Sequence, residues 1–107
     1  MPPRDPSHCA WVYIISNKSH MLYVGITADL AQRFRQHRDG TYENAFTARY
    51  HFDRLVYYEP HDSLNDAARR EQEIKGWRRS KKVALIQSVN PDWDDLSPRL
   101  DWMALLR

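Results

Sequence analysis

Two short apolar runs, each carrying one tyrosine, constrain the fold of this chain more than any other feature. The runs cover residues 11–15, which include Tyr13, and residues 22–26, which include Tyr23. A six-residue linker with turn-forming residues separates them, and this arrangement predicts a β-hairpin with a slightly long loop. Tyr13 and Tyr23 are therefore expected on adjacent antiparallel strands.

A predicted helix follows the hairpin directly and stops at Asp39 and Gly40. Thr27 or Asp29 can cap its start, and Asp29 together with Gln32 resembles a capping box. We expect this helix to fold back over one face of the hairpin.

Arg33 and His37 are four residues apart on this helix and share one face. Arginine offers a planar fork of donors for phosphate oxygens, and histidine exchanges a proton near neutral pH. If Tyr13 and Tyr23 point to the face that the helix covers, the four side chains converge in a way that suits phosphate chemistry. Each also has an ordinary structural explanation, because tyrosine fits a half-buried strand and a lone histidine is more often structural than catalytic.

The middle of the chain predicts one further strand. Residues 41–53 carry no clean periodicity, which indicates a loop. Residues 54–59 are rich in β-branched and aromatic side chains and predict a third strand, which we expect Pro60 to end.

Two more helices are predicted after that strand. Ser63 can cap a long helix that Gly76 weakens near its end, and Ser80 can cap a second helix that closes at Asn90. The predicted fold class is therefore α+β, with a small three-stranded antiparallel sheet flanked by helices.

Length and composition narrow the classes of protein. A chain of 107 residues suits one domain, which we expect over residues 10–96, after a flexible terminus at 1–9 and before a tail or short helix at 97–107. The single cysteine, Cys9, excludes an internal disulfide framework and indicates a reducing compartment. No apolar run approaches the roughly 20 residues needed to span a bilayer, so we expect a cytoplasmic protein without a membrane partner.

The net charge of +2 is too small to indicate a nucleic-acid-binding protein by itself, but the basic residues are concentrated. Seven of them lie between positions 69 and 82: Arg69, Arg70, Lys75, Arg78, Arg79, Lys81 and Lys82. Basic side chains with Trp77 among them suit a phosphate backbone. The alternative is a solvated helix face, which such runs form more often.

Glu71 is the most informative single residue. On the predicted helix it lies four residues after Ala67 and three before Ile74, and therefore on the apolar stripe. A carboxylate on a core-facing stripe is paired, hydrogen-bonded or bound to a metal, because burying an unpaired charge is costly. Glu73 has the spacing of a solvated face. The spacing alone leaves open a simple salt bridge between Glu71 and an arginine.

Taken together, these residues resemble the GIY-YIG endonuclease domain, and specifically its small stand-alone bacterial members related to the nuclease module of the excision-repair nuclease. Residues 11–13, Trp-Val-Tyr, stand where the family has Gly-Ile-Tyr, and residues 23–25, Tyr-Val-Gly, stand for Tyr-Ile-Gly. The other positions that match the family are Arg33, His37, Glu71 and Asn90. The chain departs from the family pattern at Trp11 and at Ile26, where a lysine is frequent.

The resemblance implies hydrolysis of a DNA phosphodiester bond with one metal ion, Mg²⁺ or Mn²⁺, held by Glu71. Tyr13 would act as general base on the attacking water, and Tyr23 would orient that water or the phosphate. Arg33 would balance charge on the phosphoryl oxygens, and His37 would assist proton transfer. Gly25 and Asn90 would lie at the DNA beside the basic residues. The implied activity is structure-selective cleavage in DNA repair or recombination.

Two other classes of function stay open. The chain could be a non-catalytic nucleic-acid-binding module with the same fold, which would bind DNA without regard to divalent metal. It could also be a protein-interaction adaptor that uses its apolar C-terminal residues. A protein partner that supplies specificity and a homodimer formed through the C-terminal leucines are further expectations.

Overall fold

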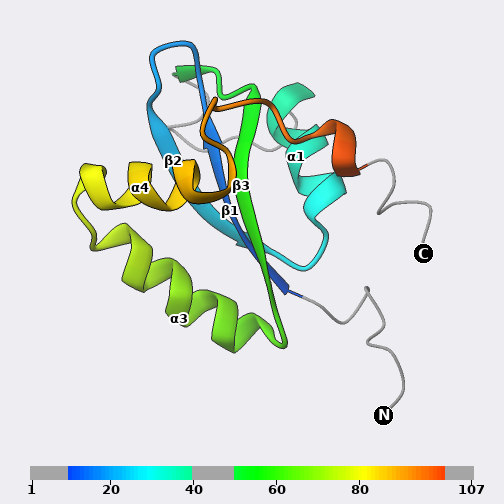
Figure 1. The fold of residues 1–107 in the computed structure, drawn as a ribbon. Helices are drawn as coiled ribbons and strands as arrows, with labels where there is room; N and C mark the ends of the chain where they lie inside the picture. The colour runs from blue at the N-terminus through cyan, green and yellow to red at the C-terminus, as the bar shows by residue number, and fades with distance from the viewer. Residues whose placement is uncertain (1–9, 40–49, 101–107) are drawn as a thin grey trace.

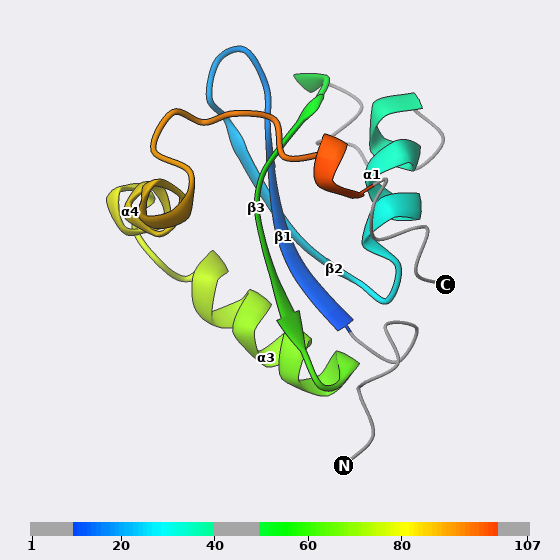
Figure 2. The same ribbon diagram turned by 45° about the vertical axis from the view of Figure 1, so that its right-hand side comes forward.

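The computed structural model describes residues 10–39 and 50–100. Three antiparallel strands form one sheet: β1 (Ala10–Ser16), β2 (Leu22–Thr27) and β3 (Arg54–His61), in the order β2-β1-β3. Helix α1 (Leu30–Asp39) covers one face of the sheet, and α3 (Leu64–Lys75) and α4 (Arg79–Val89) cover the other (Figures 1 and 2). This confirms the predicted class, a three-stranded antiparallel sheet flanked by helices.

Alternation along β1 divides the core into two layers. Val12 and Ile14 are fully buried on the side of α3 and α4, where they pack with Ile74 and Ile86. Tyr13 and Ile15 are buried on the side of α1, where they pack with Leu30, Phe34 and Phe52. Because successive side chains of a strand point to opposite faces, the central strand supplies both layers.

The hairpin between β1 and β2 is organised by one asparagine. Asn17 is 6% exposed, and its Oδ1 accepts hydrogen bonds from the backbone N–H groups of Ser19 and Met21 at 3.0 and 3.1 Å. Its Nδ2 donates to the carbonyl oxygen of Tyr50 at 2.8 Å. The predicted turn is therefore also tied to the segment that precedes β3.

Two of the predicted helix starts are confirmed. The backbone N–H of Gln32 donates to Asp29 Oδ1 at 3.1 Å at the start of α1. The N–H of Asp66 donates to Ser63 Oγ at 3.1 Å at the start of α3. Side chains that accept from the first turn satisfy donors that have no partner within the helix.

Two boundaries were predicted wrongly. Strand β3 continues through Pro60 to His61, because proline is tolerated on an edge strand, where its missing N–H interrupts no ladder on the outer side. Helix α4 begins at Arg79 with Arg78 as its N-cap, which makes no side-chain capping bond. Ser80 therefore lies inside the helix and does not cap it.

The segment after α4 returns to the α1 side of the sheet (Figure 2). The N–H of Leu96 donates to the carbonyl oxygen of Leu55 at 2.7 Å, and Leu96 and Leu100 are buried in the same core layer as Phe34. Residues 1–9, 40–49 and 101–107, which include the expected flexible terminus, most of the expected loop and the C-terminal leucines, lie outside the described residues. Within the described residues, no helix is long and apolar enough to cross a membrane.

Candidate active site around Tyr13 and His37

The centre of the site is the contact between Tyr13 and Gly25. The two residues are register partners on β1 and β2, and the ring of Tyr13 lies over the glycine. A Cβ atom added at Gly25 would lie 2.5 Å from Tyr13 Cζ and 3.0 Å from Cε1, and it would also collide with the hydroxyl oxygen. The end of Tyr13 therefore occupies the space in which a side chain at position 25 would lie.

Helix α1 brings His37 to the same hydroxyl. The Tyr13 hydroxyl oxygen and His37 Nε2 are 3.0 Å apart, and the two residues are 1% and 8% exposed. Burial, with the nearby Arg33 cation as a second cause, lowers the pKa of His37 to about 4. The imidazole is therefore neutral at pH 7. In the tautomer that carries its hydrogen on Nδ1, Nε2 accepts the hydroxyl hydrogen of Tyr13.

Tyr23 completes the aromatic group. Its ring centroid lies 6.4 Å from that of Tyr13, 5.6 Å from that of His37 and 6.1 Å from that of Phe52. Tyr23 and Arg33 are both half-buried, whereas Tyr13 is almost fully enclosed. The expected convergence of the two tyrosines with the α1 residues is thus present, with Tyr23 and Arg33 closer to solvent than Tyr13.

Glu71 lies on the other side of the sheet, on α3 (Figure 2). Its side chain is 13% exposed and that of Glu73 is 57% exposed, as the helical spacing predicts. Among the described residues, Glu71 contacts Lys75 Nζ at 3.4 Å and Gln72 Nε2 at 3.5 Å. The neighbouring cation is therefore a lysine on the same helix and not an arginine.

Helix geometry defines the direction in which Glu71 lies. Ala67 and Ile74 form the buried stripe of α3, and at 100° per residue Arg70 and Glu71 flank this stripe on opposite sides. Arg70 Nε donates to Glu59 Oε2 on β3 at 3.1 Å. Glu71 therefore occupies the flank away from β3, on the side of the edge strand β2.

The donor set for a metal ion is minimal. Within the described residues no three His, Cys, Asp or Glu side chains gather in one place. Mg²⁺ often uses one or two carboxylates and completes its shell with waters and substrate phosphate oxygens. A single carboxylate with limited exposure, as at Glu71, fits that kind of site and does not fit an all-protein cage.

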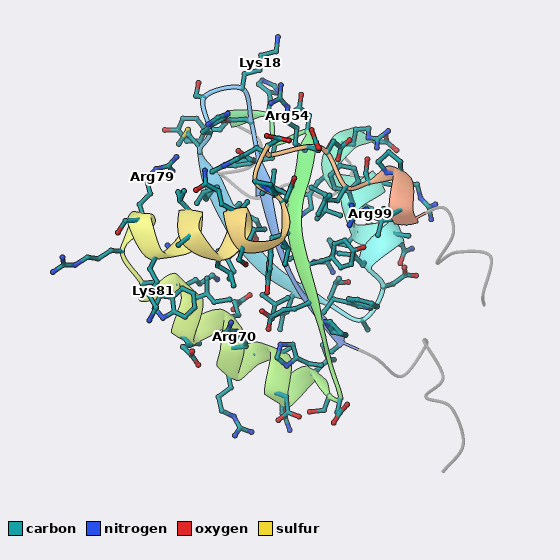
Figure 3. The ribbon with its side chains drawn as sticks, in the orientation of Figure 1. Lys18, Arg54, Arg70, Arg79, Lys81 and Arg99 are labelled. Atoms are coloured by element: carbon teal, nitrogen blue, oxygen red, sulfur yellow. The ribbon has the colours of Figure 1, made fainter. Side chains whose placement is uncertain are left out.

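The basic residues of positions 69–82 divide into two groups. Arg69 pairs with Asp66 at 3.3 Å and Lys75 with Glu71, so that part of their charge is balanced locally. The exposed group surrounds the start of α4, where Arg79 and Lys81 extend from the helix (Figure 3). Arg78 is exposed and Lys82 half-buried beside them. Among the described residues this second group makes no ion pair, which makes it the better candidate for a nucleic-acid surface.

Arg70 belongs to a polar cluster between β3 and α3 that the sequence did not reveal. Glu59 Oε1 accepts the hydroxyl hydrogen of Tyr57 at 2.6 Å, and its Oε2 lies 2.5 Å from His61 Nε2. Arg70 also donates to Glu73 Oε1 at 2.8 Å. These contacts lower the pKa of Glu59, although burial of the carboxylate opposes the shift. Burial, followed by the hydrogen bond to Glu59, raises the pKa of Tyr57 far above its usual range. The alternating polar residues at the end of β3 were the only sequence signal for this cluster.

Asn90 occupies a structural position. It is 4% exposed, and its Nδ2 donates to the carbonyl oxygens of Val56 and Asp94 at 3.0 and 2.9 Å. Its Oδ1 accepts from the N–H of Asp94 at 3.0 Å. The amide thus joins the end of α4 to β3 and to the following turn, and these bonds occupy both ends of the group.

Comparisons with known proteins show which proteins this chain is similar to. A model of the GIY-YIG catalytic domain matches residues 9–84. A UPF0213 protein from Syntrophus aciditrophicus is 34% identical over 82 residues, which cover 77% of this chain and 93% of that protein. A second UPF0213 protein, from Staphylococcus saprophyticus, is 36% identical over 76 residues and covers 71% and 92%.

A solved structure is similar as well. The solution NMR structure of a UPF0213 protein from Bacillus halodurans superposes with a TM-score of 0.52 at 30% sequence identity. The match covers 81% of this chain and 92% of that one. The fold is thus similar to that of a small UPF0213 protein, and the sequence is similar to those of several proteins with the same name.

Proposed function

Because this chain belongs to the GIY-YIG nuclease family, we propose that it is an endonuclease that hydrolyses DNA phosphodiester bonds with the help of one divalent metal ion. The observation that carries the proposal is the buried hydrogen bond between the Tyr13 hydroxyl and the neutral imidazole of His37, packed against Gly25. A buried tyrosine that is hydrogen-bonded to a neutral imidazole at 3.0 Å can pass its own hydrogen to that imidazole as it takes a proton from a water molecule, although the lowered pKa of His37 makes this acceptor a weak base.

In the proposed mechanism Tyr13 is the general base. Its hydroxyl accepts a proton from the attacking water while its own hydrogen moves to Nε2 of His37. A free tyrosine, with a pKa of about 10, is a poor base at neutral pH as long as it keeps its hydrogen. Transfer of that hydrogen along an existing hydrogen bond avoids the need for a preformed tyrosinate.

The half-buried residues face the substrate in this proposal. Tyr23 orients the attacking water or the phosphate, and Arg33 balances charge that develops on the phosphoryl oxygens. Because Tyr13 is 1% exposed, the water must approach it from the side of Tyr23 and Arg33. Loss of one donor that acts mainly on the transition state typically slows a reaction about 10²- to 10³-fold, which is the effect we expect for Arg33→Ala on cleavage with little effect on DNA binding.

Glu71 is the proposed metal ligand, for Mg²⁺ or Mn²⁺. The ion, when bound, would polarise a phosphoryl oxygen as a Lewis acid. Glu71 contributes one carboxylate, and Lys75 at 3.4 Å limits the negative charge of the site. The exposed cations at the start of α4 would track the DNA backbone. Structure-selective cleavage in repair or recombination, in the cytoplasm, is the finer proposal and rests on the resemblance to the excision-repair nuclease.

The proposal is tested by comparing the purified protein with its Glu71→Ala and Glu73→Ala variants. Both residues lie on α3 and carry the same charge, but their side chains are 13% and 57% exposed. Labelled single-stranded, duplex, flapped and branched DNA is incubated with Mg²⁺, Mn²⁺ or EDTA. We expect cleavage that needs metal, is lost in Glu71→Ala and persists in Glu73→Ala.

Two results would contradict the proposal. DNA binding without cleavage in any metal would favour the non-catalytic binding module. Full cleavage at neutral pH by Tyr13→Phe would remove the general base from the mechanism even if the nuclease activity itself is real.

A further inference from the structure

A cavity of about 310 Å³ lies on the flank of α1 that does not carry His37. Its apolar lining includes Ala31, Phe34 and Leu100, which are 5%, 2% and 3% exposed. Arg35, Arg38, Asp95, Ser97 and Pro98 complete the lining. The cavity thus combines an apolar floor with a polar rim that includes two arginines.

The rim of the cavity carries two arginines and one carboxylate and is therefore net positive. Asp95 already accepts three hydrogen bonds, from the N–H groups of Leu55 and Ser97 at Oδ1 and from the Ser97 hydroxyl at Oδ2. Arg38 is held in place, because its Nη2 donates to Ser97 Oγ at 3.1 Å and its guanidinium carbon lies 5.0 Å from the Phe34 ring centroid. Arg35 is exposed and makes no hydrogen bond or ion pair within the described residues.

The cavity is one helix width away from the candidate active site. At 100° per residue, Arg33 and His37 lie on one flank of the Leu30 and Phe34 stripe, and Arg38 lies on the other. An α-helix with its side chains is about 10–12 Å across. A DNA strand with a phosphate at the active site therefore needs only a few nucleotides to cross α1 and reach the cavity.

We propose that this cavity binds one unpaired nucleotide of the DNA substrate, with the base against the Arg38 guanidinium and its phosphate at Arg35. This inference rests on the proposed nuclease function and names its substrate class, DNA with a single-stranded segment beside the cleaved bond. The volume is at the small end of ligand sites, of roughly 300–1,000 Å³, and suits one nucleotide. The Arg38 guanidinium, which lies over the Phe34 ring, offers a planar surface on which a base stacks, and the Arg35 guanidinium can pair with phosphate oxygens. A paired and stacked base of a duplex cannot enter without being extruded.

The test measures binding in EDTA, so that its result does not depend on cleavage. A fluorescein-labelled thymidine decamer and a labelled hairpin duplex are titrated with the full chain and its variants at fixed salt. Ala31→Leu fills the cavity with apolar volume, and Arg35→Ala removes a rim charge at an exposed position. We expect each to weaken binding of the decamer about tenfold and binding of the duplex by less than about twofold.

Arg69→Ala is the matched control, because Arg69 is an exposed arginine with a side chain 80% accessible on the opposite face of the sheet. It should change decamer and duplex affinity by the same small factor. Unchanged decamer binding in Arg35→Ala, or equal losses for decamer and duplex in both cavity variants, would overturn the inference. Thermal unfolding of Ala31→Leu shows whether that variant is folded, and Arg35→Ala decides the matter if it is not. If the binding test fails but DNA is cleaved, the proposed nuclease function is kept and the cavity proposal is rejected. If DNA is not cleaved but the decamer is bound selectively, the cavity proposal is kept and the nuclease function is rejected.

Discussion

Replacing Gly25 by alanine should disrupt the site from within. The new Cβ would lie 2.5 Å from Tyr13 Cζ, a separation that no folded protein tolerates without movement. Tyr13 is 1% exposed, packs in the α1 core layer and shares a hydrogen bond with His37. The ring must therefore shift against its neighbours and away from the imidazole.

The magnitude follows from these contacts. Forcing extra volume into a packed core costs about 1–3 kcal/mol, and loss of a buried hydrogen bond adds about 1 kcal/mol. Alanine in place of glycine in a strand stabilises by about 0.5–1 kcal/mol, because it lowers the conformational entropy of the unfolded chain. We expect Gly25→Ala to lower the free energy of unfolding by about 2–3 kcal/mol and to reduce cleavage as well.

A double-mutant cycle isolates the cause. Tyr13→Leu removes the Cζ and hydroxyl atoms that the new Cβ would meet, whereas Tyr13→Phe removes only the hydroxyl. In the leucine background Gly25→Ala should be neutral or slightly stabilising, and in the phenylalanine background it should still destabilise, because Cζ remains. Urea unfolding followed by circular dichroism gives each free energy. An equal cost of Gly25→Ala in all three backgrounds would refute the reasoning.

Three further outcomes follow from the described contacts. His37 takes up a proton near pH 6.5 in the unfolded chain but only near pH 4 in the folded chain. Protonation therefore stabilises the unfolded chain as the pH falls between these values, by up to about 3 kcal/mol. The free energy of unfolding, measured from pH 7 to 4, should fall less steeply in His37→Asn. Asn90→Ala removes the partner of the buried Val56 carbonyl and of two part-buried backbone groups of Asp94 and should cost about 1–3 kcal/mol in urea unfolding. A cost below about 1 kcal/mol would contradict its structural role. Glu59→Gln should destabilise by about 1–3 kcal/mol, because Arg70 loses the more buried of its two charged partners and keeps only Glu73, and this loss should largely vanish in an Arg70→Met background.

The local signals in the sequence predicted much of the fold. Apolar runs rich in β-branched and aromatic residues predicted the strands, and Asp29 and Ser63 marked the starts of α1 and α3, because capping depends on a few neighbouring residues. Pro60 and Ser80 misled for a related reason. Whether a strand is at an edge, or whether a helix starts one residue earlier, depends on contacts with distant segments that no local pattern contains.

Parts of the candidate site could likewise be predicted from the sequence, and other parts could not. The helical spacing of Arg33 and His37 and the hairpin that holds both tyrosines were enough to predict their convergence. Asn90 could not be placed from sequence, because its three hydrogen bonds reach Val56 and Asp94 and arise only when α4 packs beside β3. Gly25 was expected to lie at the DNA, and the group that lies against it in the structure is the chain's own Tyr13.

The proposed mechanism makes one demand on how DNA binds. Tyr13 and His37 lie on the α1 face of the sheet and Glu71 lies on the α3 face, so a single phosphate can meet both only around an edge of the sheet. Glu71 occupies the flank of α3 on the side of β2, and β2 is an edge strand. Tyr13 fills the space above Gly25 on the α1 face, so the half-buried Tyr23 and Arg33 are the residues through which a phosphate can reach the site from β2. Under the proposed mechanism the scissile phosphate lies at the outer edge of β2 near Tyr23, and substitutions there should impair cleavage more than those along the outer edge of β3.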